Sequence, residues 1–296
     1  MKTKFTELEV IEIIKNVYPR ATNVKKMTEG LVSQTYFFAN IDDQLVFQIS
    51  KDIEGYYKED YVYRTFSKYI SVKEIQKIDN LYDDIYYCIS KYIDAKRLHD
   101  LTLDEINQIE KNILETLELM KKIEIDDDNG FGYFDSKGVA KYLTWKDFIL
   151  AIKNTGYYNW DLSDRKICEI INSCINEIEK YCDVIDSKRH LLHGDFGSYN
   201  VLTDNKKVYL IDWSLGLYGD PLYEIANILF WNEKCLSPIV DILKNTYETK
   251  NKQKIYVYLL RIGLEEIYRT QKNKESGFNI EWLLKRVEEI IRLNHK

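Results

Sequence analysis

The sequence predicts an α+β fold in which a small strand-rich lobe precedes a larger helical lobe. β-Branched and aromatic runs such as LVFQIS (45–50) are concentrated in the first part of the chain. Further along, apolar residues recur at the three- and four-residue spacing of amphipathic helices. We therefore expect an N-lobe of residues 1–93 and a C-lobe of residues 94–296.

The N-lobe begins with an expected helix over residues 6–18, which Thr6 can cap and Pro19 ends. Another helix is expected over 56–70. The expected strands of the lobe run over 31–39, 44–50 and 85–93. Residues 40–43 lie between the first two strands, so they are expected to form a hairpin turn.

The C-lobe is expected to be mainly helical because its apolar residues follow a helical period. The expected helices run over 103–123, 145–153, 163–182, 222–231, 254–271 and 281–293. Two short runs with strand character interrupt them, at 200–203 and 208–212.

Composition narrows the functional classes. The chain has 42 Lys+Arg against 48 Asp+Glu, which argues against a nucleic-acid partner and permits a cationic ligand. Its five cysteines lack C-x-x-C spacing and its four histidines are scattered, so reduced thiols are expected in place of a zinc site. Acidic residues interrupt the apolar N-terminal stretch, and no run of 18 apolar residues occurs. We expect a cytoplasmic monomer that does not bind membranes.

The segment LLHGDFGSYNVLTDNKKVYLIDWS (191–214) carries the chemistry. Asn200 follows Asp195 by five residues, and Asp212 ends an apolar strand seventeen residues after Asp195. Phosphoryl transfer needs a carboxylate that orients a hydroxyl and accepts its proton, and Asp195 is the candidate. It also needs hard oxygen ligands for a divalent metal, which Asn200 and Asp212 provide. Turns and a strand alone would not explain this joint spacing.

A D-F-G triplet occurs at Asp195-Phe196-Gly197, but it lies on the predicted catalytic loop. The metal-binding position that protein kinases mark with this signature corresponds to Asp212. Protein kinases also need a long segment after that position and an A-P-E anchor. Eight residues separate Asp212 from Pro221, and the sequence has no A-P-E, so we exclude a protein kinase.

HGDFGSYNVL and LIDW resemble the loop of the aminoglycoside phosphotransferase family and the wider protein-kinase-like superfamily. The flanking segments 211–232 and 259–270 are similar to the hygromycin-phosphorylating branch of that family. The resemblance implies a bilobal protein-kinase-like fold with a nucleotide between the lobes. It implies ATP or GTP with Mg²⁺ as cofactors, Asp195 as base, and Asn200 and Asp212 as metal ligands. The implied acceptor is an aminoglycoside, hygromycin B, phosphorylated on its 4-hydroxyl.

The nucleotide residues come mainly from the same resemblance. EGLVSQTYFF (29–38) resembles the hairpin that covers the phosphates, in which Gly30 permits a close turn and Ser33 can hydrogen-bond a phosphate. Ser90 and Tyr92 lie in the expected hinge, where backbone groups would meet the base.

Gln48 departs from the family pattern, because the third strand normally carries a phosphate-binding cation that pairs with an acid on the next helix. Lys51 is the first candidate to replace it. The other candidate cations are Lys58 and Arg64, and the candidate acids are Glu59 and Asp60.

Four acids are expected to contact a cationic substrate: Asp220, Glu224, Glu265 and Glu266. Helix capping and a solvated face are the alternatives for these acids. Trp145 and Trp231 are candidates to wall the site, although the core is the better expectation for both.

Two functional alternatives remain open. A kinase for another small alcohol, such as choline, a sugar or a different antibiotic, would use the same loop. A non-catalytic nucleotide-binding module is supported only by Gln48.

Overall fold

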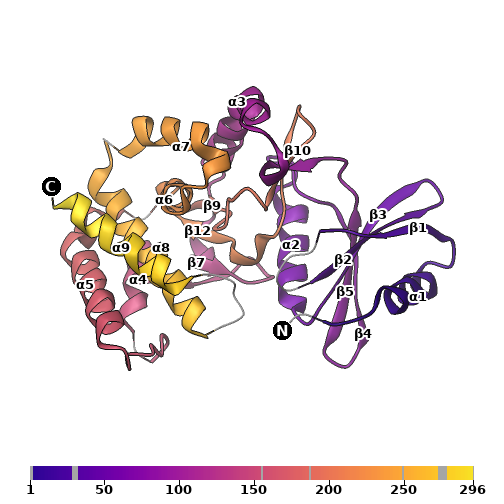
Figure 1. Ribbon diagram of the computed structural model, residues 1–296, viewed down its shortest axis with the longest axis horizontal. Coiled ribbons are helices and arrows are strands. Elements are labelled where there is room, and N and C mark those ends of the chain that lie inside the picture. The colour runs from indigo at the N-terminus through magenta and orange to yellow at the C-terminus, as the bar shows by residue number, and fades with distance from the viewer. Residues whose placement is uncertain are drawn as a thin grey trace. The chain divides into compact units, whose positions relative to one another are not determined.

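The computed structural model describes most of the chain and divides it into two compact units (Figure 1). The described residues are 3–28, 33–154, 156–186, 188–248, 250–272 and 279–295. The first unit comprises the residues up to Lys96, Asp135–Gly138 and Val201–Ser214, and the second comprises Arg97–Phe134, Val139–Asn200 and Leu215–Lys296. The α+β class is confirmed. Each predicted lobe is one continuous stretch of sequence, whereas each of these two units is assembled from three separate stretches.

The first unit is built on an antiparallel five-stranded sheet in the order β1-β2-β3-β5-β4. Its strands are β1 (Ala21–Lys26), β2 (Gln34–Asn40), β3 (Asp43–Ser50), β4 (Ile75–Tyr82) and β5 (Ile85–Lys91). The predicted hairpin joins β2 to β3, with Asn40 opposite Asp43 and Ile41 in the left-handed region at φ 56°. The described part of the predicted strand 31–39 lies in β2.

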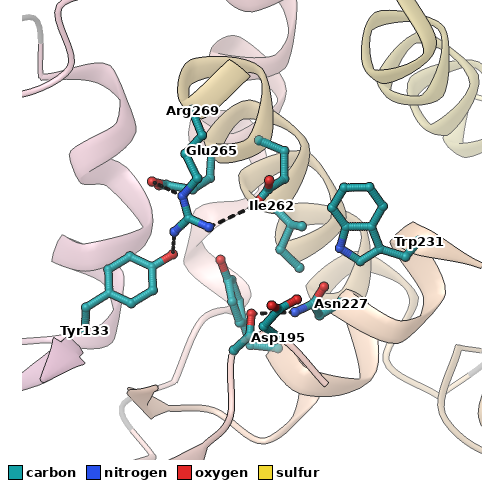
Figure 2. Close-up of a pocket in the computed structure, with 10 residues that line it drawn as sticks. Tyr133, Asp195, Asn227, Trp231, Ile262, Glu265 and Arg269 are labelled. Carbon is teal, nitrogen blue, oxygen red and sulfur yellow. Dashed lines mark hydrogen bonds and ion pairs between the residues drawn. The ribbon is translucent and has the colours of Figure 1, made fainter. Parts of the chain in front are cut away.

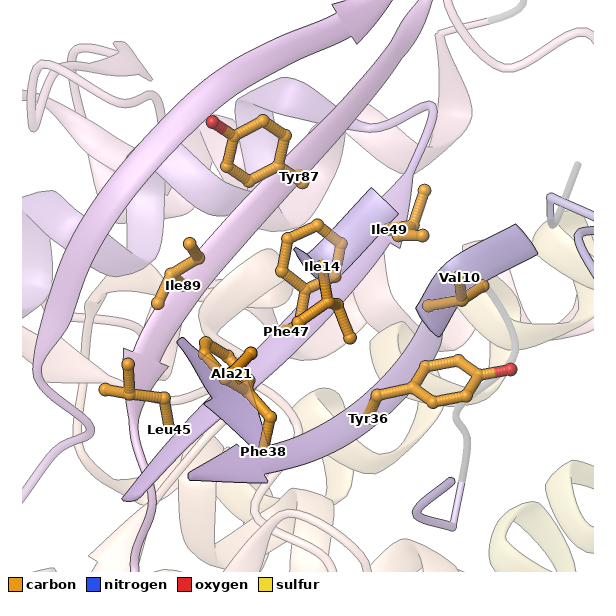
Figure 3. Close-up of a cluster of buried hydrophobic side chains, with 10 residues drawn as sticks. All are labelled: Val10, Ile14, Ala21, Tyr36, Phe38, Leu45, Phe47, Ile49, Tyr87 and Ile89. Carbon is orange, nitrogen blue, oxygen red and sulfur yellow. The ribbon is translucent and has the colours of Figure 1, made fainter. Parts of the chain in front are cut away.

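One face of the sheet packs against helix α1 (Glu7–Val17) (Figure 3). Successive strand side chains point to opposite faces, so alternate residues share this core. The buried cluster comprises Val10, Ile14, Ala21, Tyr36, Phe38, Leu45, Phe47, Ile49, Tyr87 and Ile89. Thr6 caps α1 as predicted, accepting a hydrogen bond from the Glu9 amide.

The opposite face of the sheet packs against helix α2 (Ile53–Phe66), where Tyr56 contacts Ile75 and Cys88. Asp52 begins the helix by accepting a hydrogen bond from the Gly55 amide at 3.0 Å. Gln48 lies opposite Cys88 in the β3–β5 pair, so it also belongs to the face that α2 covers.

The same unit contains the antiparallel pair β10 (Val201–Thr203) and β11 (Val208–Leu210). The predicted strands at 200–203 and 208–212 correspond to this pair. The Leu210 amide donates to the Ser71 carbonyl at 3.0 Å, and Val72 forms a parallel bridge with Leu210. The segment before β4 is therefore fixed beside the end of β11.

The second unit is mainly helical. Its α-helices are α3 (Leu103–Met120), α4 (Trp145–Leu150), α5 (Arg165–Tyr181), α6 (Leu222–Trp231), α7 (Ser237–Leu243), α8 (Lys252–Lys272) and α9 (Ile280–Asn294). Each predicted helix of this part has a counterpart here, and α7 was not predicted. No helix in the described ranges is both long enough and apolar enough to cross a membrane.

Short strands in this unit form a sheet in the order β8-β7-β12-β9. They are β7 (Phe131–Phe134), β8 (Ala140–Tyr142), β9 (His190–Leu192) and β12 (Leu217–Gly219). The two-residue strand β6 (Lys96–Arg97) belongs instead to a three-stranded sheet in the order β11-β10-β6. Leu192 pairs with Leu217, so the β8-β7-β12-β9 sheet fixes the point from which the segment after β9 leaves. This segment carries the candidate catalytic residues.

Candidate active site

The predicted catalytic loop follows β9, beginning at His193. Gly194 has φ 77°, and a Cβ at this position would lie 2.2 Å from the Leu215 carbonyl oxygen. Both the left-handed conformation and the close backbone require glycine here. The sharp turn at Gly194 therefore sets the direction in which the chain continues to Asp195.

Helix α6 holds this turn through two buried side chains. Glu224 Oε2 accepts hydrogen bonds from the backbone amides of His193 at 2.5 Å and Gly194 at 3.0 Å. Asn227 Nδ2 donates to the Gly194 carbonyl oxygen at 2.7 Å. Burial raises the pKa of Glu224 to about 7, against the lowering effect of these backbone amides. Glu224 thus stabilises the backbone of the loop, whereas the sequence predicted that it contacts the substrate.

Asn200 lies against Asp195 within the same loop. Its Nδ2 donates to Asp195 Oδ2 at 2.7 Å and to the Asp195 carbonyl oxygen at 3.1 Å. The amide nitrogen of Asn200 therefore orients the candidate base, while the amide oxygen remains a hard donor suited to a divalent cation. The candidate base and the candidate metal ligand thus lie within hydrogen-bond distance of each other in one loop.

Asp195 lines a pocket within the second unit (Figure 2). The lining residues are Tyr133, Gly194, Asp195, Tyr223, Asn227, Trp231, Ile262, Glu265, Glu266 and Arg269. Trp231 walls the pocket, whereas Trp145 is fully buried and donates from Nε1 to the Tyr258 hydroxyl at 2.9 Å. The pocket brings the predicted base together with two of the four predicted substrate-contacting acids.

Those two acids are already paired with arginines. Glu265 Oε2 lies 2.7 Å from Arg261 Nη1 and accepts from the Tyr158 hydroxyl at 2.8 Å. Glu266 Oε1 lies 3.0 Å from Arg269 Nη1, and Arg269 Nη2 donates to the Tyr133 hydroxyl at 3.0 Å. Arg269 was not predicted as a pocket residue, because an arginine in a helical segment does not by itself indicate a binding site.

The pKa values of Glu265 and Glu266 are shifted in opposite directions. Burial would raise the pKa of Glu265, but the charges of Arg261 and Arg269 outweigh burial and hold the pKa below its usual range. Burial raises the pKa of Glu266 to about 7, with only Arg269 strongly opposing it and with Glu265 and Asp195 adding repulsion. Of these two glutamates, Glu265 is therefore the one whose ionised form the surrounding charges favour.

Asp220 does not line this pocket. Its carboxylate is buried, with Oδ2 accepting from the Tyr258 hydroxyl at 2.9 Å and lying 3.0 Å from Lys254 Nζ. Oδ1 accepts from the Leu222 amide in the first turn of α6 at 3.0 Å. These contacts match the alternative expectation that Asp220 helps to begin the helix.

The other predicted metal ligand, Asp212, belongs to the first unit. Asp212 has φ 61°, and its amide donates to Glu59 Oε1 on α2 at 2.8 Å. The Ser214 hydroxyl donates to Asp212 Oδ1 at 2.7 Å. Glu59 therefore fixes the backbone of Asp212 in a left-handed conformation that few side chains adopt.

The donor chemistry fits Mg²⁺. This ion is usually held by one or two carboxylates together with substrate phosphates and water. Asp212 offers a carboxylate and Asn200 an amide oxygen, both hard donors. Within the described ranges, no group of three or more His, Cys, Asp and Glu side chains is placed to hold a metal ion.

Lys73 pairs with Glu59, and the sequence analysis did not identify it. Its Nζ lies 2.5 Å from Glu59 Oε2 and donates to Gln48 Oε1 at 2.7 Å. Burial would lower the pKa of Lys73, but the charge of Glu59 outweighs it and raises the pKa. The lysine is therefore charged. Its partner lies fourteen positions earlier in the sequence, a spacing that gives no signal of contact.

The residues predicted to bind the nucleotide differ in burial and in the contacts that they make. Gly30 lies outside the described residues, and Ser33 is buried in the first unit. Ser90 is buried on β5, and the Tyr92 amide donates to the Gln44 carbonyl at 2.9 Å. Lys51 pairs with Asp84 at 2.7 Å, with both side chains exposed. The structure therefore gives the predicted phosphate role of Lys51 no support.

Three comparisons with known proteins bear on this site. A sequence model of a phosphotransferase enzyme family, APH, matches residues 26–255. Hygromycin-B 4-O-kinase of Escherichia coli is 29% identical over 298 residues, covering 98% of this chain and 87% of that protein.

Solved structures are similar over the same extent. A thermostable mutant of aminoglycoside phosphotransferase APH(4)-Ia, in ternary complex with AMP-PNP and hygromycin B, has a TM-score of 0.89 at 29% identity. That comparison covers 96% of this chain and 98% of the other. An APH(2″)-IIIa complex with GDP and kanamycin has a TM-score of 0.67 at 13% identity, covering 97% of this chain and 100% of the other. At that identity the likeness shows a shared fold alone.

Proposed function

Because the chain belongs to the phosphotransferase enzyme family, we propose that it transfers the γ-phosphoryl group of ATP or GTP to a hydroxyl of an aminoglycoside. One observation carries the choice of acceptor: Asp195 lines the same pocket as Glu265 and Glu266. The candidate base thus lies beside carboxylates whose charge would suit the ammonium groups of an aminoglycoside.

In the proposed reaction, an acceptor hydroxyl oxygen attacks the γ-phosphorus as the bond from that phosphorus to the β–γ bridging oxygen breaks. The nucleoside diphosphate leaves, and the hydroxyl proton moves to the Asp195 carboxylate. Asn200 Nδ2 lies 2.7 Å from Asp195 Oδ2, so it holds the carboxylate in one orientation. Glu224 and Asn227 fix the backbone that carries Asp195. Positioning of this kind is the main contribution that protein groups make to phosphoryl transfer.

Asn200 and Asp212 would hold Mg²⁺. When bound, the ion supplies positive charge that neutralises the triphosphate. Ser214 and Glu59 position Asp212 through its carboxylate and its backbone amide respectively. These contacts belong to the chain itself and do not depend on the ion.

Hygromycin B is the first acceptor to test, because the hygromycin-B 4-O-kinase matches nearly the whole chain. The protein has a formal net charge of −6, so a polycationic antibiotic should associate faster at low ionic strength. Choline and a neutral sugar represent the other small-alcohol acceptors.

The test measures phosphate transfer from ATP and from GTP to hygromycin B, kanamycin, choline and a neutral sugar. Phosphorylated products are identified by mass spectrometry, with Asp195→Ala as the inactive control. Transfer to hygromycin B supports the proposal in full, and transfer to kanamycin alone retains the aminoglycoside class. Rapid phosphorylation of choline or a sugar, with no transfer to either antibiotic, would overturn it.

A further inference from the structure

Gln48 occupies β3, the strand from which kinases normally project a phosphate-binding lysine. That lysine makes an ion pair with a glutamate on the following helix. In this chain α2 supplies the glutamate, Glu59, but a glutamine stands on the strand. The buried carboxylate of Glu59 therefore needs a cation from elsewhere, because an unpaired buried charge is costly.

Lys73 supplies that cation from the segment just before β4. Its ammonium nitrogen lies 2.5 Å from Glu59 Oε2 and 2.7 Å from Gln48 Oε1. Its side chain is 11% exposed, so the ion pair is largely shielded from water. Gln48 is thus the acceptor that orients a lysine from the segment before β4.

The backbone around Lys73 is fixed relative to Asp212. Leu210, two residues before Asp212, pairs with Ser71 and Val72, which directly precede Lys73. The two oxygens of Glu59 divide their contacts, with Oε2 pairing with Lys73 and Oε1 accepting from the Asp212 amide at 2.8 Å. One carboxylate therefore holds both the cation and the backbone of the candidate metal ligand.

The cations first considered for this role make other contacts. Lys51 pairs with the exposed Asp84 at 2.7 Å. Arg64 pairs with Asp60 at 2.8 Å and its side chain is 75% exposed. Lys58 donates to the Ser214 carbonyl at 3.0 Å. Lys73, by contrast, contacts both Glu59 and the residue at the lysine's usual place.

We propose that Lys73, in the segment before β4, is the phosphate-binding cation of this enzyme in place of a lysine on β3, with Gln48 and Glu59 as its positioning residues. The proposal rests on the proposed function, since it assumes a nucleoside triphosphate as the donor. A lysine ammonium has three donors, of which Gln48 and Glu59 accept two among the described residues. The third donor is directed to a phosphate oxygen of the nucleotide.

The test is direct nucleotide binding by calorimetry, with ATP, ADP and adenosine as probes and no acceptor present. In Lys73→Gln, affinity for ATP and ADP should fall about tenfold to a hundredfold, the effect of losing a charge-assisted hydrogen bond. Adenosine affinity should be unchanged, because adenosine has no phosphate. Lys77→Gln is the matched control, since Lys77 lies nearby on β4 and its side chain is 46% exposed.

Exchanging the residues at positions 48 and 73 tests whether Lys73 binds phosphate or only forms a structural ion pair with Glu59. The double variant Gln48→Lys/Lys73→Gln returns the lysine to β3, keeps Glu59 paired and should recover most of the ATP affinity. This variant also keeps the proposal testable if Lys73→Gln alone fails to fold.

Three results would overturn the proposal: normal ATP affinity in Lys73→Gln, equal losses for ATP and adenosine, or a folded exchange variant that does not bind ATP. A larger ATP loss in Lys51→Gln than in Lys73→Gln would transfer the role to Lys51. Failure of the proposed function would give a different result. If the parent protein binds ATP through Lys73 but phosphorylates no aminoglycoside, only the proposed acceptor is wrong.

Discussion

The carboxylate of Glu224 holds His193 by its backbone amide, with Oε2 of the glutamate 2.5 Å from the amide nitrogen. The same oxygen accepts from Gly194 at 3.0 Å, one residue before the candidate base. Glu224 lies in the first turn of α6, so the position of this helix determines where Asp195 is presented.

Replacing Glu224 should therefore impair turnover without affecting nucleotide binding. Glu224→Ala removes the acceptor for the buried His193 amide and the partly buried Gly194 amide, and leaving a buried group unsatisfied costs about 1–3 kcal/mol of stability. We expect kcat to fall on the order of 10- to 100-fold because Asp195 is displaced. Calorimetry with ATP should give an unchanged Kd. A fall in substrate affinity alone, with normal kcat, would restore Glu224 to its predicted role as a substrate contact.

Glu224 should also make stability depend on pH. Its pKa is raised from 4.5 to about 7 by burial, so the native state binds its proton more tightly than the unfolded state does. The stabilising contribution is complete below about pH 4.5 and is lost as pH rises through about 7. Glu224→Gln imitates the protonated form. The parent should therefore lose stability relative to this variant between pH 5 and pH 8, measured by urea unfolding, whereas a constant difference would contradict the assignment.

The fold was largely predictable because most of its elements have a strong local signal. The apolar stripe of α8 and the capping residues of α1 appear directly in the sequence. The strands β7, β8, β9 and β12 were missed because three- or four-residue strands hardly display alternation. Strands β1 and β4 were also missed, because their many exposed positions make them polar.

The proximity of Asp195 and Asn200 could be expected from the sequence, because the two residues are five positions apart in one segment. Contacts that join distant segments were not predictable. Lys73 pairs with Glu59 from the segment before β4, and Arg269 donates to the hydroxyl of Tyr133, 136 positions away in the sequence. Sequence spacing cannot reveal which of many charged side chains the fold brings together.

Asp195→Ala should remove most turnover and leave the nucleotide affinity near that of the parent. A positioned acid–base group contributes on the order of 10²–10⁴-fold to the rate. The measurement is single-turnover transfer from ATP to the best acceptor, with thermal unfolding as a check on the fold. Turnover within about threefold of the parent would remove Asp195 from the role of base.

Asn200→Ala and Asp212→Ala should each raise the Mg²⁺ concentration needed for half-maximal activity, because each removes an oxygen donor from a hard cation. Asn172→Ala, which removes an exposed amide on α5, is the control. Titration of activity with Mg²⁺ at saturating ATP provides the measurement. An unchanged midpoint in both variants would remove them from the set of metal ligands.

Arg269 should weaken the binding of polycationic acceptors. It lines the pocket with Asp195, its side chain is 28% exposed, and it pairs with Glu266 at 3.0 Å and with Glu265 at 3.4 Å. Arg269→Gln removes a positive charge from the pocket and leaves Glu265 paired with Arg261. We expect kcat/KM for hygromycin B to rise several-fold at low salt, because the repulsion between like charges is lost. Transfer to a neutral sugar, if measurable, should change little.

The dependence of kcat/KM on ionic strength, together with the Tm, tests whether the effect of Arg269→Gln is electrostatic. The gain for hygromycin B should shrink as ionic strength rises, since added ions screen the charges that remain exposed. Arg292→Gln, an exposed change on α9, alters the net charge equally and should leave kcat/KM near that of the parent. Removing Arg269 leaves Glu266 buried without its cation, so the Tm should fall moderately. Equal losses of kcat/KM for charged and neutral acceptors, in step with a lower Tm, would instead show that Arg269 serves only to hold the pocket together.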